Sequence, residues 1–152
     1  MRADLSKFVE RIGDLIKEWE ARGVKIDEIA ENAGQNLCDL YHWKSPKNRY
    51  FPSLPQIIAL ADYFSCSVGY LIGVQDENGL FVKGMKAAEF GQRLKCVLTE
   101  KKMPIAVLAR KANLANTSAI YNWINGKNLP RVDSLVAVCK VLDCMPDELL
   151  RD

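Results

Sequence analysis

The sequence contains a single histidine, His42, and its five cysteines include no Cys-x-x-Cys pair. Because structural zinc is held by closely spaced cysteine and histidine side chains, this composition argues against a metal site. We therefore expect no metal and no cofactor. We interpret the cysteines as small, buried, apolar side chains that stay reduced because the protein is in the cytoplasm. They are Cys38, Cys66, Cys96, Cys139 and Cys144.

Long apolar runs are also missing. No stretch approaches the roughly 20 apolar residues that a membrane-spanning helix needs, and the mixed-charge segment 1–8 lacks the apolar core of a signal peptide. We therefore expect a cytoplasmic protein with no membrane partner.

The chain also lacks a recognisable catalytic constellation. No glycine-rich phosphate loop or serine elbow is present, and His42 has no cysteine or serine partner in a supporting context. The acidic pairs Asp27-Glu28 and Asp147-Glu148 fall at predicted helix starts, where they offset the helix dipole. We predict that the protein is not an enzyme, and no small-molecule ligand is indicated.

Charge is unevenly distributed along the chain. Residues 1–76 contain 9 Lys/Arg and 11 Asp/Glu, a net of −2, whereas residues 77–152 contain 12 and 8, a net of +4. Binding to a polyanion draws much of its affinity from neutralised phosphates, so the second half is the better candidate for nucleic-acid binding.

The most informative stretch runs from Pro104 to Arg131. Apolar residues recur there at three- and four-residue steps in two short segments, separated by Asn113-Leu114 and closed by Asn125-Gly126. This pattern predicts two short helices joined by a tight turn. The outer face of the second helix would be polar and free of acid, as a helix in a DNA major groove requires. That face would present Asn116, Thr117, Ser118, Tyr121, Asn122 and Asn125, followed by Lys127, Asn128 and Arg131.

A repeat of nearly 80 residues organises the whole chain. The offset between the copies is 79 residues at Ile29-Ala30 and Leu108-Ala109, 80 at the tryptophans, and 78 from the prolines onward. Self-similarity at a fixed period predicts that one structural unit occurs twice. The other paired positions are Ala33/Ala112, Trp43/Trp123, Pro52/Pro130, Ile57/Leu135, Ala61/Cys139, Phe64/Leu142, Cys66/Cys144, Leu71/Leu149 and Ile72/Leu150.

Both copies resemble the Cro/lambda-repressor type of helix-turn-helix domain. The second copy matches the family pattern through Leu108-Ala109, Ile120, Trp123, Gly126-Lys127, Pro130 and Leu149-Leu150. The first matches through Ile29-Ala30, Gly34, Leu40, Trp43, Pro52-Ser53-Leu54 and Tyr70-Leu71-Ile72-Gly73. The resemblance implies an all-α protein with two tandem five-helix units and a prokaryotic or phage regulator. It also implies double-stranded DNA as the partner.

We predict a first unit over residues 1–74, a linker over 75–84 and a second unit over 85–152. The apolar spacing predicts helices over residues 5–22, 25–33, 36–44 and 68–72, with a further helix capped by Ser53. Asn36 and Asp39 have the spacing of a capping box, as do Ser53 and Gln56. In the second unit we predict a helix over 86–101, and a next helix with Pro104 at its first position.

The predicted base contacts are Asn116, Thr117, Ser118, Tyr121 and Asn122. Among them Asn122 is the sharpest candidate, because an amide can bond adenine N6 and N7 together. The predicted backbone contacts are Lys127, Asn128 and Arg131 in the second unit and Lys44, Lys47 and Arg49 in the first. Many members of the family bind a phosphate through a glutamine at the start of their second helix. Ile26 and Ile105 stand there instead, which puts that contact in doubt.

Two functional hypotheses remain open. In the first, the chain is a sequence-specific transcriptional regulator with the second unit as main reader. In this case the two tandem units would take the place of the two subunits of the family's dimer and read half-sites about 34 Å apart. The alternative arrangement is a homodimer of the chain. In the second, one or both units are protein-interaction modules with an antitoxin-like or assembly role. Removing Lys127 and Arg131 separates them, because only DNA binding should collapse.

Overall fold

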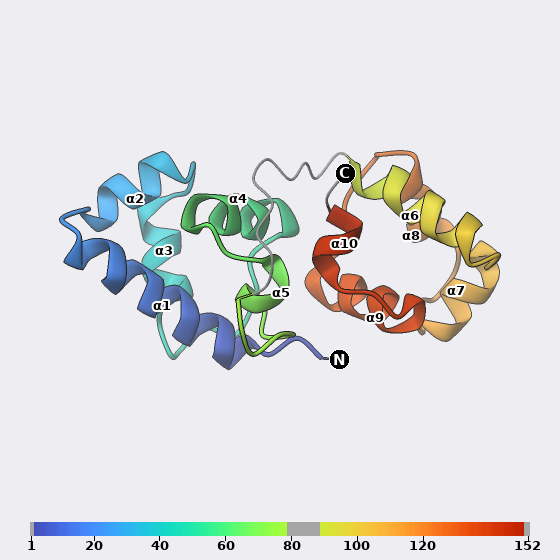
Figure 1. Cartoon of the computed structure of the whole chain (residues 1–152), viewed down its shortest axis with the longest axis horizontal. Coiled ribbons are helices and arrows are strands. Elements are labelled where there is room, and N and C mark those ends of the chain that lie inside the picture. The colour runs from blue at the N-terminus through green and yellow to red at the C-terminus, as the bar shows by residue number, and fades with distance from the viewer. Residues whose placement is uncertain (1, 79–88, 151–152) are drawn as a thin grey trace. The chain divides into compact units, whose positions relative to one another are not determined.

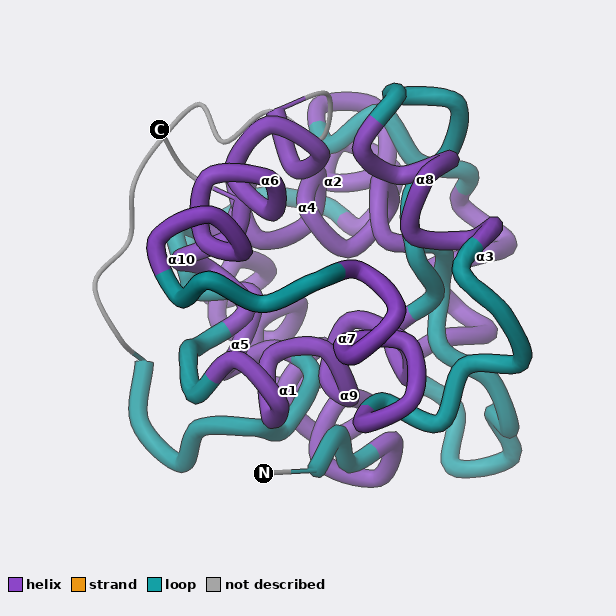
Figure 2. The backbone as a smooth tube through the Cα atoms, turned by 90° about the vertical axis from the view of Figure 1, so that its right-hand side faces the viewer, coloured by secondary structure: helices purple, strands orange, loops and turns teal. Residues whose placement is uncertain are grey.

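The computed structural model describes residues 2–78 and 89–150, and every secondary-structure element in these ranges is a helix (Figure 2). The prediction of an all-α fold is confirmed. Helices α1–α5 and α6–α10 fall into two compact units, called here the N-terminal unit and the C-terminal unit (Figure 1). The boundaries at 74 and 84 stay predictions. Most of the predicted linker, including Leu80-Phe81-Val82, lies outside the described residues.

The helices of the N-terminal unit are α1 Leu5–Ala21, α2 Ile26–Asn32, α3 Leu37–Trp43, α4 Leu54–Phe64 and α5 Val68–Leu71. Helix α1 buries Phe8, Ile12 and Ile16, a stripe at four-residue steps that faces the core. After α1, Gly23 takes a positive φ of 91°, a conformation that glycine adopts without steric cost. The helices predicted over residues 5–22, 25–33, 36–44 and 68–72 agree with α1, α2, α3 and α5 to within one or two residues at each end.

Helix α4 begins with the predicted capping box. The Ser53 hydroxyl accepts from the Gln56 backbone N–H at 3.5 Å, and the Gln56 side chain accepts from the Ser53 N–H at 3.0 Å. At the other end, Ser65 takes the left-handed conformation and the Cys66 N–H donates to the Ala61 carbonyl at 3.0 Å. This bond ends α4 and turns the chain into α5.

Asp4 fixes the start of α1 to the end of α5. Its carboxylate accepts from the backbone N–H groups of Ser6 at 3.0 Å and Lys7 at 3.3 Å, while its own N–H donates to the Ile72 carbonyl at 2.9 Å. The Ser6 hydroxyl, followed by the Lys7 backbone N–H, holds the pKa of Asp4 below its ordinary value. The carboxylate form is therefore favoured by folding.

We expect Asp4→Ala to destabilise the N-terminal unit by about 1 kcal/mol at neutral pH, the usual contribution of an N-cap. Because folding lowers the pKa of Asp4, its contribution is complete above the unfolded pKa of about 4 and is lost as pH falls through the folded value. Urea denaturation of both proteins at about pH 6 and about pH 3 checks this. Asp4→Asn, which caps without titrating, is the control; a deficit that persists unchanged in acid would contradict the prediction.

The helices of the C-terminal unit are α6 Phe90–Glu100, α7 Ile105–Lys111, α8 Ser118–Ile124, α9 Val132–Leu142 and α10 Pro146–Leu150. Its core is formed by the apolar faces of all five, including Phe90, Leu94, Leu108, Leu135 and Leu149, each fully buried. The closing helix α10 packs on α6, as α5 packs on α1 in the N-terminal unit. Residues 86–88 of the predicted first helix lie outside the described residues.

Three details of the sequence analysis were wrong. Asn36 caps α3 by accepting from the Cys38 N–H at 2.8 Å, with no reciprocal bond from Asp39 among the described contacts. Pro104 precedes α7 as its N-cap instead of occupying its first helical position. The cysteines are not all buried, because Cys38 and Cys96 are exposed and Cys144 is half-buried. A cysteine on the outer side of a helix cannot be told from a core cysteine by composition.

Candidate nucleic-acid interface

Helices α7 and α8 are joined by a turn whose geometry also occurs in the N-terminal unit. Asn113 takes a positive φ of 58°, and the Leu114 N–H donates to the Ala109 carbonyl at 2.9 Å. Gly34 takes φ 69° at the paired position between α2 and α3, followed by a 2.8 Å bond from Gln35 to Ala30. Asparagine tolerates the left-handed region better than most residues, so it can stand where the other copy has glycine.

The start of α8 is set by Asn116. Its side-chain oxygen accepts from the Ser118 backbone N–H at 2.9 Å, so this atom satisfies one of the unpaired donors of the first turn. Ser118 is the first helical residue, and Thr117 before it is half-buried. The side-chain oxygen of Asn116 thus has a structural role in the turn, whereas Ser118 is exposed at the tip of the helix.

One face of α8 gathers most of the predicted base contacts. Ile120 and Trp123 face the core, with exposed fractions of 0% and 5%. The residues of the opposite face are three and four positions apart, and this face therefore points outward. Tyr121 is 51% exposed on this face and Asn122 is half-buried. Asn125 is the C-cap, the turn role expected for it. The outward face consists of Ser118, Tyr121, Asn122 and Asn125.

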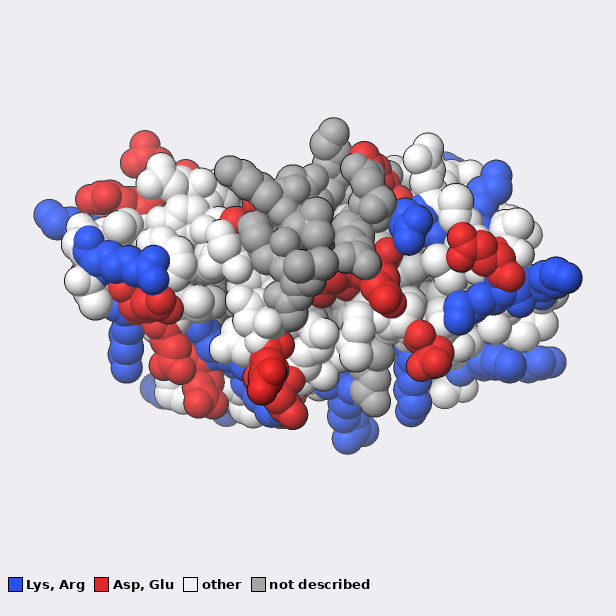
Figure 3. Space-filling view, viewed as in Figure 1, with Lys and Arg blue, Asp and Glu red and all other residues white. Residues whose placement is uncertain are grey.

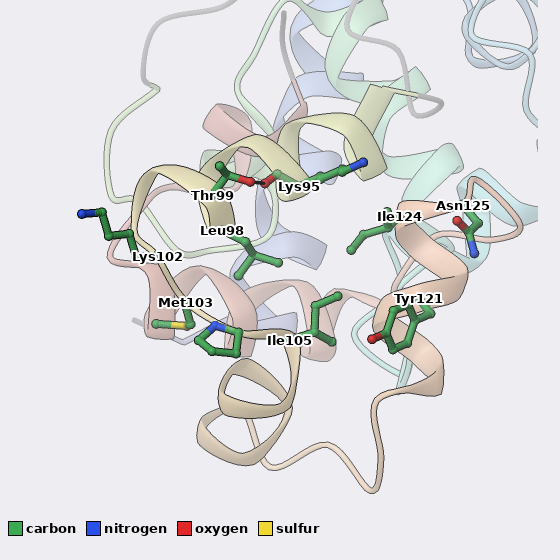
Figure 4. Close-up of a pocket in the computed structure, with 10 residues that line it drawn as sticks. Lys95, Leu98, Thr99, Lys102, Met103, Ile105, Tyr121, Ile124 and Asn125 are labelled. Carbon is green, nitrogen blue, oxygen red and sulfur yellow. Dashed lines mark hydrogen bonds between the residues drawn. The ribbon is translucent and has the colours of Figure 1, made fainter.

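A hollow of about 560 Å³ lies beside this face, between α6, the start of α7 and α8. Leu98, Ile105 and Ile124 point into it from the three helices, and Tyr121 leans over it from α8 (Figure 4). The aromatic ring therefore has an apolar support on one side. Half of the Tyr121 side chain stays exposed, at 51%.

The basic residues follow α8 in the chain. Lys127, Asn128 and Arg131 are all exposed, and none of them forms an ion pair with a described residue. Arg131 is the N-cap residue of α9 and makes no side-chain capping bond there. In Figure 3, basic side chains also gather over α6 and α7, whereas they alternate with acidic ones over α1 and α2.

Gly91, which was not among the predicted site residues, lies in close contact with the end of α8. A Cβ added at Gly91 would lie 2.2 Å from the Trp123 carbonyl oxygen and 2.9 Å from that of Ile124, both backbone atoms. Only glycine therefore lets α6 approach the end of α8 this closely. A glycine inside an apolar-periodic helix was the available signal, since glycine is unfavourable there without a packing reason.

The matching face of the N-terminal unit is different in character. Helix α3 exposes Leu37 and Tyr41, at 36% and 50%, together with Cys38 and His42. The Lys44 amine lies over the Tyr41 ring at 5.2 Å. Arg49 donates to the carbonyls of Pro46 and Asn48, at 3.3 Å each. Of the three predicted phosphate contacts here, Lys47 and Arg49 are exposed and Lys44 is half-buried.

The described residues contain no group of His, Cys, Asp and Glu side chains that could hold a metal ion. None of the helices in residues 2–78 and 89–150 is long and apolar enough to cross a membrane.

A known protein family matches the C-terminal unit, which contains α7, α8 and the basic residues after them. Residues 93–152 match the Cro/C1-type HTH DNA-binding domain. The match runs from Arg93 in α6 to the end of the chain, so it includes the α7–turn–α8 segment and both basic residues after it. It does not include α1–α5. Searches of curated proteins and of solved structures found no match.

The matched residues include α7, α8 and the turn between them. The resemblance inferred from the sequence is therefore supported for the second copy. The individual base and backbone contacts stay predictions.

Proposed function

We propose that the chain is a sequence-specific DNA-binding transcriptional regulator whose C-terminal unit is the main reader. The observation that carries this is the acid-free outward face of α8, followed by the cations Lys127 and Arg131, which form no ion pair within residues 2–78 and 89–150. The match of residues 93–152 to the Cro/C1-type domain supports it. Side chains on α8 would read base edges, and the two cations would neutralise phosphates.

Arg131 supplies a further argument. In the N-terminal unit the paired position is Ser53, which caps α4, whereas Arg131 leaves α9 without a side-chain cap. A cation at a helix N-terminus is also unfavourable for the helix dipole. The second copy thus tolerates a local cost of about 1 kcal/mol. Residues that break a local rule in this way are expected at functional positions.

We predict that Arg131→Ser changes stability and binding in opposite directions. The variant should gain an N-cap and stabilise the C-terminal unit by about 1 kcal/mol. It should weaken duplex binding roughly tenfold, because a charge-assisted bond to phosphate is lost. The slope of log K against log salt should fall by about 0.9. Hydrogen exchange of the α9 amides and fluorescence anisotropy with a labelled duplex measure the two effects.

Ser53→Ala is the matched control for this experiment. It should destabilise α4 by about 1 kcal/mol and leave duplex affinity unchanged, since the C-terminal unit is the proposed reader. Unchanged affinity and salt slope in Arg131→Ser would remove Arg131 from the interface, whatever its effect on stability.

The proposed function itself is tested by selection from random duplexes at physiological salt. One enriched motif supports a specific reader, and two half-motifs at a fixed spacing support readout by both units. Salt-sensitive binding without enrichment would limit the protein to phosphate contacts. Absence of binding would overturn the proposal.

A second candidate function concerns the N-terminal unit, which we propose as a protein-interaction module. The observation that favours it is the apolar character of the α3 face, where Leu37 and Tyr41 are exposed and Asp39 would repel phosphates. Exposed apolar residues gathered on one helix are typical of protein contacts. Leu37→Ser with Tyr41→Ser should then abolish partner capture and leave duplex binding intact. Loss of duplex binding in this double variant would favour DNA readout by both units.

A further inference from the structure

The corner between α9 and α10 brings two cysteines together. Asp143 takes the left-handed conformation at φ 53°, and the Cys144 N–H donates to the Cys139 carbonyl at 3.1 Å. This six-to-one bond is the mark of a Schellman motif, which a contact between the side chains of the two bonded residues frequently accompanies. Here the two thiols share a hydrogen bond. The fold therefore directs both thiols to the same place.

The two thiols have different environments. Cys139 is fully buried in the core and Cys144 is half-buried. Their mutual hydrogen bond, followed by burial, raises the pKa of Cys139. The same hydrogen bond, followed by the charge of Lys101, lowers the pKa of Cys144 against the opposing effects of burial, Glu148 and Asp143. The accessible thiol is thus the better thiolate, and thiolates are the form that reacts.

The N-terminal unit contains the same backbone corner with one thiol. Ser65 takes φ 55°, and the Cys66 N–H donates to the Ala61 carbonyl at 3.0 Å. Cys66 pairs with Cys144 in the repeat, but alanine stands where the C-terminal unit has Cys139. The N-terminal corner therefore differs from the C-terminal one in two ways: it has alanine in place of the second cysteine, and its thiol is fully buried.

We propose that Cys139 and Cys144 form a thiol pair that hydroperoxides convert reversibly into an intramolecular disulfide. The Cys144 thiolate attacks a peroxide oxygen, the O–O bond breaks, and the departing hydroxide takes a proton to leave as water. Cys144 is then a sulfenic acid. The Cys139 sulfur displaces its hydroxyl group, the S–S bond forms, and the Cys139 proton leaves with the hydroxide as a second water. Two thiols and one hydrogen peroxide thus give one disulfide and two waters.

The geometry suits this bond. Disulfides join residues whose Cα atoms are about 4.4–6.8 Å apart, and here the two backbones are already joined by a hydrogen bond. Cys139 needs no solvent access for the second step, because the sulfenic acid forms next to it. The ring would enclose only the 4 residues 140–143. Since such a short ring constrains the unfolded chain little, thiol reductants should reopen the bond.

The test uses the full chain with Cys38→Ser and Cys96→Ser, which removes the two exposed thiols. Hydrogen peroxide should lower the intact mass by two hydrogens, peptide mapping should find the Cys139–Cys144 cross-link, and dithiothreitol should restore both thiols. Cys144, which is half-buried, should react roughly tenfold faster than Cys66, which is fully buried. Adding Cys139→Ala should leave Cys144 as a sulfenic acid that dimedone traps.

Ala61→Cys is the control for access of peroxide to the thiols. It places two thiols at the N-terminal corner, but both positions are buried, so peroxide should leave them without a cross-link under the same conditions. The proposal is overturned if peroxide leaves Cys144 reduced, or if Cys139 and Cys144 are oxidised separately without a cross-link. The mapping in the protein that retains both thiols decides this even if Cys139→Ala does not fold. The outcome is independent of DNA binding.

Discussion

Replacing Gly91 by alanine should destabilise the C-terminal unit by about 3 kcal/mol, the upper part of the range for overpacking. The added methyl group would lie 2.2 Å from the Trp123 carbonyl oxygen and 3.0 Å from the Ile124 Cα, so backbone must move. Hydrogen exchange of the α6 and α8 amides measures the loss, and the α1 and α4 amides provide an internal reference.

Gly13→Ala is the matched control, since Gly13 lies in the first helix of the other unit. A Cβ there meets only the Lys44 Cβ at 3.9 Å, an ordinary contact. Without a clash, alanine should stabilise α1 by about 0.5–1 kcal/mol, because glycine is the poorer helix former. If Gly91→Ala behaved like Gly13→Ala, the close approach of α6 and α8 would not exist in solution.

The same variant has a functional readout. The atoms that Gly91 approaches belong to the last residues of α8, directly before Asn125-Gly126 and Lys127. A displacement of the C-terminal end of α8 would shift both the outward face of α8 and Lys127. We therefore expect duplex affinity to fall in Gly91→Ala, and to stay unchanged in Gly13→Ala.

The second large effect is expected for Asn122→Ala. If Asn122 bonds adenine N6 and N7 together, its loss should reduce the preference for that adenine by about 1–3 kcal/mol, or roughly 5- to 150-fold. Affinity for unrelated duplexes and the salt slope should stay constant, because no phosphate contact is removed. Selection from random duplexes, followed by titration of the enriched site and its single-base variants, measures this.

Asn125→Ala is the control for that prediction. Asn125 lies on the same face one turn later, but it ends α8 as the C-cap. Its substitution should lower helix stability slightly and leave the base preference as it was. Equal preferences at every position in Asn122→Ala and in the unsubstituted protein would exclude Asn122 from base readout. A loss of preference in Asn125→Ala alone would move the reading position one turn along the helix.

Local features could be predicted because they depend on neighbouring residues. Ser53 and Gln56 form the expected capping box, and the stripe of Phe8, Ile12 and Ile16 faces the core. The start of α8 could not be fixed in advance among Asn116, Thr117 and Ser118. The extra residue of the second turn allows more than one start, and the bond from the Ser118 N–H to Asn116 selects one of them.

The environments of the cysteines could not be predicted from the sequence. Composition predicted five equivalent buried cysteines, whereas the structure exposes two of them and pairs Cys139 with Cys144. The five-residue spacing of Cys139 and Cys144 is compatible with many backbone conformations. The left-handed conformation of Asp143 between them brings the two sulfurs together. Asp143 takes that conformation because α9 must end and α10 must return to pack on α6.

The sequence by itself determined that this protein is helical, that it contains one pattern twice, and that the second copy carries the acid-free face and the excess of basic charge. Those properties follow from periodicity, capping residues and charge, which act within a few residues. The tertiary structure alone decided how closely α6 approaches α8 at Gly91 and which cysteines are exposed. These depend on close packing between segments far apart in the chain, and a helical pattern places no constraint on that packing.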